Sequence, residues 1–342
     1  MKFKTFLSCV FILSLTFAFG QDKKALIRQI DSLIHLKQPR PFNGVVLLTK
    51  NGKILYEKTQ GFKNTDSKKP IEPDNQFEIM SNTKQITAVL LLKEVEKGKV
   101  DLQSPIKKYL PDLTQLWADS VTVHQLLNHT HGIVDTGKPL VFKPGTDYKY
   151  GNLSNNLLGR IIENVSQKTY RELAESLFQS LKMKNTFCYS ENKKSRLVSG
   201  HELEKQVFKV VNRTFISEYN LPADGVITTA KDLATWNAKL HQGKILQSKT
   251  YKLMTASSVL SQHDVFGEEK MGYGYGIRIV EDKGITYFGH TGLGDGFASL
   301  NIYVPRKDIS IIVLENVMAD SSDLYYYFEK GIKDLVIHNF AN

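Results

Sequence analysis

Cysteine is nearly absent from this chain: its 342 residues contain two, Cys9 and Cys188. Cys9 falls in an N-terminal segment that we expect to be removed, which leaves Cys188 as the single cysteine of the mature protein. An internal disulfide is then excluded, and so is a metal site built from two cysteines. The fold must therefore depend on its hydrophobic core, for which 41% apolar residues are sufficient.

Long apolar segments are also few. The one extended run is Phe6–Phe19, which carries no charge and is shorter than the roughly 20 residues of a membrane-spanning helix. Two lysines precede it and small residues end it, which is the pattern of a secretory signal peptide. We expect residues 1–20 to be a signal peptide, residues 21–342 to form one domain, and the protein to be periplasmic or secreted, with no membrane attachment after cleavage. An uncleaved N-terminal anchor is the alternative.

Acidic residues are outnumbered: 45 lysines and arginines against 35 aspartates and glutamates give a net charge of +10. The basic residues are scattered, and no basic stripe is interleaved with aromatic residues, so we expect no nucleic-acid partner. A basic surface could favour anionic envelope polymers, but a merely soluble surface is the simpler interpretation. No repeat or flexible linker divides the chain, and we expect a monomer.

The two ends of the chain carry strand patterns. Gly44–Lys50 and Lys53–Glu57 flank Asn51-Gly52, a dipeptide typical of two-residue hairpin turns because both residues tolerate positive φ angles. Beyond residue 270 the β-rich segments return, and an amphipathic helix follows them. The predicted strands are Tyr273–Val280, Ile285–Phe288, Phe297–Val304 and Ile309–Leu314, and the predicted helix is Ser322–Asn339.

The middle of the chain has helical periodicity. Ala88–Leu92 is apolar on every side, which predicts a buried helix that Gly98 ends. The predicted fold class is α/β (α+β), with an antiparallel sheet built from both chain ends and flanked by helices. We expect the sheet region at about 40–75 and 220–340, an inserted all-α region at about 81–200, and the active site where the two regions meet.

Ser81 and Lys84 form the main catalytic pattern. Residues three apart share a helix face, so the lysine amine can reach the serine oxygen and activate it. A helix N-terminus also favours a developing negative charge. The same spacing begins at Ser104 and at Ser190, but only Ser81 precedes a buried helix. The alternative for Ser81 is a helix-capping serine.

Tyr150 and Asn152 lie two residues apart in a loop that leads into a helix. Tyr150 could share a proton with Ser81, and Asn152 could orient Lys84 and hold a substrate carbonyl. Taken alone, the same stretch is more often a turn with a packed tyrosine.

His290-Thr291-Gly292 follows the predicted strand Ile285–Phe288. Gly292 permits the close approach of another backbone, and an edge strand here could pair with an extended peptide substrate. The alternative is a polar strand end.

His129 and His131 form a His-x-His pair, the one pattern that suggests a metal. Zinc sites need further ligands, and no carboxylate or cysteine partner lies nearby. We expect no metal and keep a metallohydrolase as an alternative, which insensitivity to chelators would exclude.

Taken together, the motifs point to a family. Ser81-x-x-Lys84, Tyr150-x-Asn152 and His290-Thr-Gly292 occur in order, and this set resembles the signature elements of class C β-lactamases and their penicillin-binding relatives, including DD-carboxypeptidases. The resemblance runs from about Phe42 to Glu315 and includes the stretch Ala223–Leu233. It implies an α/β sandwich beside an all-α region, with no metal or organic cofactor.

The resemblance also implies roles for individual residues. Ser81 would be the nucleophile, and Lys84 and Tyr150 would be the acid/base pair. The backbone N–H groups of Ser81 and Leu293 would form the oxyanion hole. The substrate-binding residues would be Asn152, His290, Thr291, Gly292 and Leu293.

Three residues depart from the class C β-lactamase pattern. His290 stands where lysine is usual, Gly151 where serine or alanine is common, and His131 where serine is common. Histidine at the first of these positions is more usual in related DD-carboxypeptidases, peptidases and esterases. The departures argue against efficient antibiotic hydrolysis and leave serine acylation intact.

His290 has two possible roles. A histidine titrates in the physiological range, so a charged His290 could make recognition of carboxylate-bearing substrates dependent on pH. Alternatively, a neutral ring hydrogen-bonds locally and holds the strand end.

The sequence therefore predicts an exported serine hydrolase that cleaves amide or ester bonds through an acyl-enzyme on Ser81. Its partner is a small-molecule or peptide substrate, with cell-wall peptide as one candidate. A D-amino-acid peptidase of the DD-carboxypeptidase kind ranks first, a broad-specificity esterase second and a weak β-lactamase third. A penicillin-binding sensor that acylates without turning over is the alternative from a different class.

Overall fold

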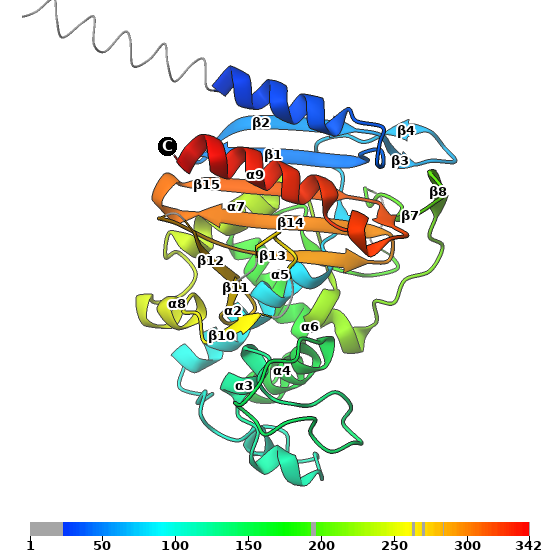
Figure 1. The fold of residues 1–342 in the computed structure, drawn as a ribbon. Coiled ribbons are helices and arrows are strands. Elements are labelled where there is room, and N and C mark those ends of the chain that lie inside the picture. Colours follow the sequence, from blue (N-terminus) through cyan, green and yellow to red (C-terminus); the bar gives the residue numbers. More distant parts are fainter. Residues whose placement is uncertain (1–22, 193–195, 262–263, 269–270, 283, 342) are drawn as a thin grey trace, which may run out of the picture.

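The computed structural model describes residues 23–341 except 193–195, 262–263, 269–270 and 283. The predicted signal peptide, residues 1–20, lies outside the described residues. An eight-stranded antiparallel sheet with the order β10-β11-β12-β13-β14-β15-β1-β2 forms the centre of the fold (Figure 1). Its strands are β1 (Gly44–Lys50), β2 (Lys53–Gln60), β10 (Val259–Ser261), β11 (Met271–Tyr273), β12 (Arg278–Asp282), β13 (Ile285–Gly294), β14 (Phe297–Val304) and β15 (Ile309–Glu315).

Both ends of the chain build this sheet. β10 to β15 follow one another as neighbouring strands, and the hairpin β1–β2 completes the sheet because β1 pairs with β15. The hairpin turn is Asn51-Gly52, with φ angles of 51° and 70°, as a two-residue turn between twisted strands requires. The predicted fold class is confirmed.

The predicted strand Tyr273–Val280 is wrong as a single element. β11 ends at Tyr273 and β12 begins at Arg278, and the chain between them turns at Gly276, which has a φ of 62°. A Cβ atom at Gly276 would collide with the backbone carbonyl of Lys84. The glycine therefore allows this turn to approach the helix that carries Lys84.

β13 is longer than predicted and contains the motif His290–Gly292. It pairs with β14 from Phe288 to Gly294, but its pairing with β12 ends at Gly289. The motif therefore lies inside a strand instead of following one. The backbone edge of His290–Gly292 that faces away from β14 lies past the end of β12.

Two helices from opposite ends of the chain cover one face of the sheet (Figure 1). They are residues 23–34 and α9 (Tyr327–Ala341). Ile30 and Ile332 of these helices pack in one cluster with Val46 of β1. Among the described residues, no helix has the length and apolar character that a membrane span needs.

The C-terminal helix begins later than the predicted Ser322–Asn339. A short 3-10 turn, Ser322–Leu324, comes first. Tyr326 then has a left-handed backbone with a φ of 59°, which separates this turn from α9 because a right-handed helix cannot continue through it.

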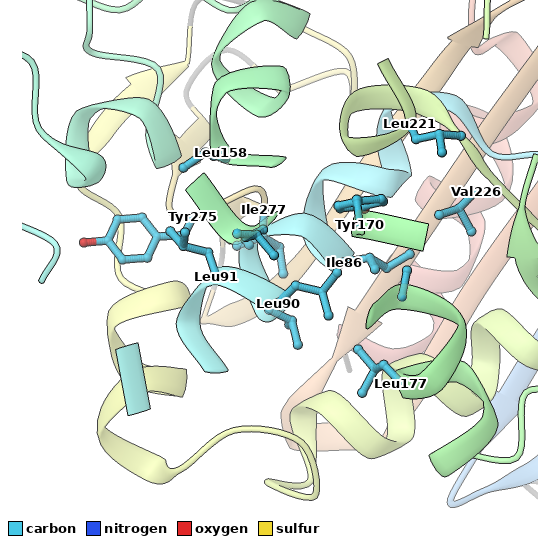
Figure 2. Packing of buried hydrophobic residues seen from close by; sticks show 14 of the residues in the cluster. Ile86, Leu90, Leu91, Leu158, Tyr170, Leu177, Leu221, Val226, Tyr275 and Ile277 are labelled. Atoms are coloured by element: carbon cyan, nitrogen blue, oxygen red, sulfur yellow. The ribbon is translucent and has the colours of Figure 1, made fainter. Parts of the chain in front are cut away.

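The helical region packs on the opposite face of the sheet. Val45 and Leu47, which alternate with Val46 along β1, belong to its core. The predicted buried helix is α2, and Gly98, with a φ of 72°, follows its end. Figure 2 shows Leu90 and Leu91 of α2 within this core. The helices are α2 (Thr83–Glu96), α3 (Val123–Leu127), α4 (Asn152–Ser166), α5 (Tyr170–Ser180), α6 (Leu221–Asp224), α7 (Ala230–His241) and α8 (Ser248–Met254).

Residues 221–254 fall within the predicted sheet region but carry α6, α7 and α8. Thr229 contributes to this difference, because its side chain accepts a hydrogen bond from Asp232 N and caps α7. Between α6 and α7 lies the short strand β9 (Val226–Thr228), which pairs with β5 (Phe77–Glu78) and β6 (Phe187–Cys188).

Two further small sheets lie outside the main one. β3 pairs with β4, and β7 pairs with both β8 and β16. These strands are β3 (Phe62–Asn64), β4 (Lys69–Pro70), β7 (His201–Glu204), β8 (Val207–Val210) and β16 (Met318–Ala319).

A buried charge cluster joins α9 to the main sheet. Arg40 makes two hydrogen bonds to the Glu315 carboxylate, at 2.8 and 2.7 Å, and its guanidinium lies 3.8 Å from Glu329. Glu329 is fully buried. Burial raises the pKa of Glu329 well above its usual value, and the neighbouring Glu315 charge raises it further. The shift favours the protonated form of Glu329, while Glu315 makes the two hydrogen bonds to Arg40.

Glu329→Gln should remove a pH dependence of stability. As pH rises through the usual glutamate pKa, the unfolded chain loses the Glu329 proton and the folded chain keeps it, so the free energy of unfolding falls. The slope is about 1.4 kcal/mol per pH unit for one proton. Urea unfolding between about pH 5 and 8 should show that glutamine cancels this contribution. Parallel curves for the wild type and the variant would contradict the assignment.

The comparison variant is Glu315→Gln, which removes the carboxylate that accepts two hydrogen bonds from Arg40 and leaves Glu329, 3.8 Å away, as the nearest carboxyl group to this buried cation. It should destabilise the protein by about 3–5 kcal/mol.

Candidate active site

Ser81 lies in a tight 3-10 turn at the start of α2. The preceding residue, Met80, has a left-handed backbone with a φ of 48°, a strained conformation that occurs at functional turns. On β14, Ser299 Oγ donates to Ile79 O at 2.9 Å, and Asn82 Nδ2 donates to Ser299 Oγ at 2.9 Å. These bonds fasten the turn to the sheet and hold Ser81 where the helical region meets it.

Lys84 places its amine against Ser81, as the spacing of three residues predicts. Its Nζ donates to Ser81 Oγ at 2.7 Å, to Asn152 Oδ1 at 2.8 Å and to Ala223 O at 3.1 Å. Asp224 Oδ1 lies 3.4 Å from the same nitrogen. Lys84 is 0% exposed, and a buried ammonium group needs this number of partners.

Asp224 was not among the residues predicted from the sequence. Its Oδ1 accepts a hydrogen bond from Ser81 Oγ at 3.0 Å, and its Oδ2 accepts one from Asn152 Nδ2. The residue is only 5% exposed. No local spacing links Asp224 to Ser81; the pairing of β5 with β9 brings their segments together.

Asn152 is the first residue of α4, and both ends of its amide are used. Oδ1 accepts from Lys84, and Nδ2 donates to Asp224. Asn152 therefore lies where it can orient Lys84. Its contact with a substrate carbonyl stays a prediction.

Tyr150 lies beside Lys84, with Nζ 5.2 Å from the centroid of the phenol ring. The guanidinium carbon of Arg278, the first residue of β12, lies 5.3 Å from the same centroid. Two buried cations therefore face this ring at cation–π distance. Arg278 was also missed, because a single arginine within a strand pattern carries no motif.

His290 is fully buried. Its Nε2 lies 3.1 Å from Tyr273 Oη and its Nδ1 lies 2.6 Å from Thr291 O. The ring also stacks near Tyr150, with the centroids 6.0 Å apart. This arrangement favours the local hydrogen-bonding role of His290 over direct recognition of a substrate carboxylate.

The rest of the third motif approaches the turn of Ser81. A Cβ atom at Gly292 would collide with Ile79 O, so the glycine allows β13 to pack against this turn. Thr291 is buried. Leu293 lines the same cavity as Ser81, which is the placement that an oxyanion hole formed by their N–H groups would need.

His290→Lys tests the role of the histidine. A third cation near Tyr150, beside Lys84 and Arg278, should displace the phenol and lower kcat/KM by about 10- to 100-fold. The loss should be similar for a carboxylated peptide and a neutral ester, and the two substrates should share one pH profile in each protein. A limb between about pH 6 and 7.5 that is seen only with the peptide and is flattened by lysine would contradict this.

His129 and His131 are both buried, with ring centroids 6.2 Å apart. Burial lowers the pKa of His129 well below its usual value, and the nearby charges of His131 and Lys84 lower it further. Burial alone lowers the pKa of His131 to about 4. Among the described residues, no group of three potential metal ligands includes them. The metallohydrolase alternative gains no support from this arrangement.

A cavity of about 440 Å³ opens at Ser81. Tyr150, Asn152, Asp224 and Leu293 also line it. Both residues of the second motif, Tyr150 and Asn152, thus share one cavity with the nucleophile, although a long stretch of sequence separates them from it. A larger groove, of about 1020 Å³, lies between the N-terminal helix and α9 and contains none of these residues.

The cavity at Ser81 is lined by both aromatic and charged side chains. Phe215 is 65% exposed, and the guanidinium of Arg213 lies 5.2 Å from its ring. Glu202 lies 3.9 Å from Arg213, and Asp295 adds a second carboxylate. A ligand here meets an aromatic surface together with charges of both signs.

The β-lactamase family model matches residues 36–328, most of the chain. The chain belongs to the β-lactamase family. Among similar solved structures is the octameric penicillin-binding protein homologue from Pyrococcus abyssi, with a TM-score of 0.77 and 26% identity over 94% of this chain and 77% of that one. The D-amino acid amidase from Ochrobactrum anthropi SV3 has a TM-score of 0.79 and 22% identity over 92% and 97% of the two chains. At 22% identity, the similarity to the amidase shows a shared fold alone.

Curated proteins of similar sequence include Protein flp from Staphylococcus aureus (strain MW2). It is 27% identical in an alignment of 323 positions that covers 86% of this β-lactamase-family chain and 64% of flp. This chain therefore spans less than two thirds of that relative. Esterase EstB from Burkholderia gladioli is 26% identical in an alignment of 199 positions that covers 47% of this chain and 50% of the esterase.

Proposed function

We propose that this member of the β-lactamase family is a serine hydrolase that forms an acyl-enzyme on Ser81. The observation that carries the proposal is the 2.7 Å hydrogen bond from Lys84 Nζ to Ser81 Oγ, at a cavity of about 440 Å³. A buried ammonium group against a serine oxygen stabilises the negative charge that this oxygen develops as it attacks. Such a pair suits acyl transfer.

The reaction would run in two steps. Ser81 Oγ bonds to the substrate carbonyl carbon and loses its proton, and the leaving nitrogen or oxygen takes up a proton as its bond to that carbon breaks. A water molecule then adds to the acyl-enzyme and returns the proton to Ser81. Lys84 and Tyr150 would activate the serine, Asn152 would orient Lys84, and the N–H groups of Ser81 and Leu293 would hold the oxyanion.

The preferred substrates would be peptides or amides of D-amino acids, with esters second and β-lactams third. Gly151, His131 and His290 depart from the class C β-lactamase pattern. The mixed lining of the cavity also suits a substrate that carries both apolar and charged groups. Similarity to a D-amino acid amidase and to an esterase is compatible with this order.

A three-substrate panel tests the proposal on the purified protein: a D-Ala-D-Ala peptide, an activated ester and a chromogenic cephalosporin. We expect the peptide to be turned over with the highest kcat/KM and the cephalosporin with the lowest. Fast turnover of the cephalosporin would overturn the order. A burst of product that stops at one equivalent with every substrate would favour the penicillin-binding sensor instead.

We propose further that the protein is exported and monomeric. The N-terminal sequence pattern supports export, and N-terminal sequencing of the protein from a periplasmic fraction would test it. Light scattering would test the monomer, since one of the similar structures is an octamer.

A further inference from the structure

The hydrogen bonds around Ser81 raise the question of which group receives its proton. Ser81 Oγ accepts a hydrogen bond from Lys84 Nζ at 2.7 Å and donates one to Asp224 Oδ1 at 3.0 Å. The hydroxyl hydrogen of Ser81 therefore points at the carboxylate and away from the amine. A proton acceptor must lie within hydrogen-bond reach of the proton that it takes, and Asp224 meets this condition.

Lys84 is surrounded by acceptors. Its Nζ makes its three shortest hydrogen bonds to oxygens of Ser81, Asn152 and Ala223, and a longer one of 3.4 Å to the Asp224 carboxylate. An ammonium group has three N–H donors and no lone pair, so these three bonds use it completely. A neutral amine would turn a lone pair toward one of the same oxygens. Asn152 Oδ1 and Ala223 O can only accept, and Ser81 donates its one hydrogen to Asp224, so the surroundings of Lys84 suit a hydrogen-bond donor.

Several contacts position the Asp224 carboxylate. Its second oxygen accepts from Asn152 Nδ2. The short helix α6 that carries it is fastened to α2, because Thr87 Oγ1 donates to Pro222 O at 2.6 Å. Gly159 of α4 allows the same proline to pack closely, since a Cβ atom there would collide with its ring. These contacts hold the carboxylate beside Ser81.

We propose that Asp224 is a catalytic residue, the acceptor of the Ser81 proton during acylation. This refinement rests on the proposed function of Ser81. As the Oγ–C bond forms, the Oγ–H bond breaks and the proton passes to Asp224 Oδ1. When the bond from carbon to the leaving group breaks, Asp224 returns the proton to the leaving nitrogen or oxygen, and the carboxylate is regenerated. Lys84 remains an ammonium group throughout and stabilises the charge on Oγ.

Asp224→Asn is the first test, because asparagine keeps the shape of the side chain and removes the basic carboxylate. The acylation rate, measured from the burst with an activated ester, should fall by about a hundred-fold or more, with little change in KM. Thermal unfolding establishes that the variant is folded at the assay temperature. Acylation within about threefold of the wild-type rate would overturn the proposal.

Asp224→Ala with added formate is the second test. Alanine leaves a space in which formate can stand in for the carboxylate, so the acylation rate should rise with formate concentration; it should not rise in Asp224→Asn, where the space is filled. If formate fails to rescue Asp224→Ala, Asp224 only supports the fold, and the proposal fails.

The matched control is Asp232→Asn. Asp232 is also a buried carboxylate, but it accepts from Asn185 N and Thr186 Oγ1, both at 2.8 Å, and not from Ser81. This variant should acylate at the wild-type rate. Ser81→Ala separates the two proposals: if it still reacts with the ester at the wild-type rate, the acyl-enzyme on Ser81 is itself wrong.

Discussion

Ser81→Ala should abolish covalent labelling and lower turnover on the order of 10³-fold or more, because loss of a nucleophile leaves only binding and oxyanion stabilisation. A fluorophosphonate or penicillin probe followed by intact-mass spectrometry measures the adduct. Peptide mapping of the labelled wild-type protein should place that adduct on the tryptic peptide that contains Ser81.

Ser104→Ala and Ser190→Ala are the controls, since both serines share the spacing to a lysine. Ser104 Oγ donates to Asp101 Oδ2 at 3.0 Å in an exposed part of the chain. Ser190 lies beyond the short strand β6 and outside the cavity of Ser81. Both variants should label like the wild type. An adduct on either serine would contradict the assignment of Ser81 as the nucleophile.

Lys84→Ala and Tyr150→Phe should each lower kcat by about a hundred-fold or more. Lys84 Nζ donates to Ser81 Oγ and lies 5.2 Å from the Tyr150 ring, so each group positions the other. The double variant should therefore lose less than the product of the two single losses. Steady-state kinetics with an activated ester measures all four proteins.

The control for this cycle lies on the same helix. Lys97, at the end of α2, is half exposed and pairs with Glu94, so Lys97→Ala should leave kcat unchanged. Lys84→Ala leaves Asp224 buried without its cation, and about 3–5 kcal/mol of stability should be lost. The assays should therefore be run well below the unfolding temperature of each variant. Multiplicative losses would show that Lys84 and Tyr150 act independently.

Local pattern was enough to predict the parts of the site that depend on one helix or one turn. Ser81 and Lys84 are three residues apart, and the helix geometry alone brings their side chains together. Asn51-Gly52 likewise predicts the turn that pairs Lys50 with Lys53, although a bulge shifts the register between Thr49 and Leu48. The strand β13 was placed correctly, although its length was underestimated.

Other features depend on contacts between distant segments and could not be predicted. Asp224 reaches Ser81 only because β5 and β9 pair. Arg278 lies near Tyr150 because the chain turns at Gly276 against α2. The burial of His290 results from the packing of Tyr150 and Tyr273 around it. In each case the deciding contact is tertiary, and no periodicity in the sequence encodes it.

The pairing of β1 with β15 affects how the chain can acquire its structure. Gly44 pairs with Glu315, and Lys50 pairs with Ile309, so the opening hairpin pairs with a strand that is far away in the sequence. Closing so large a loop costs entropy before any contact compensates for it, and sheets with such distant pairing form slowly. Until β15 pairs with it, the apolar strand β1 exposes an unpaired backbone edge to which another chain can bind. The main sheet can therefore be completed only after the segment that forms β15 has become available.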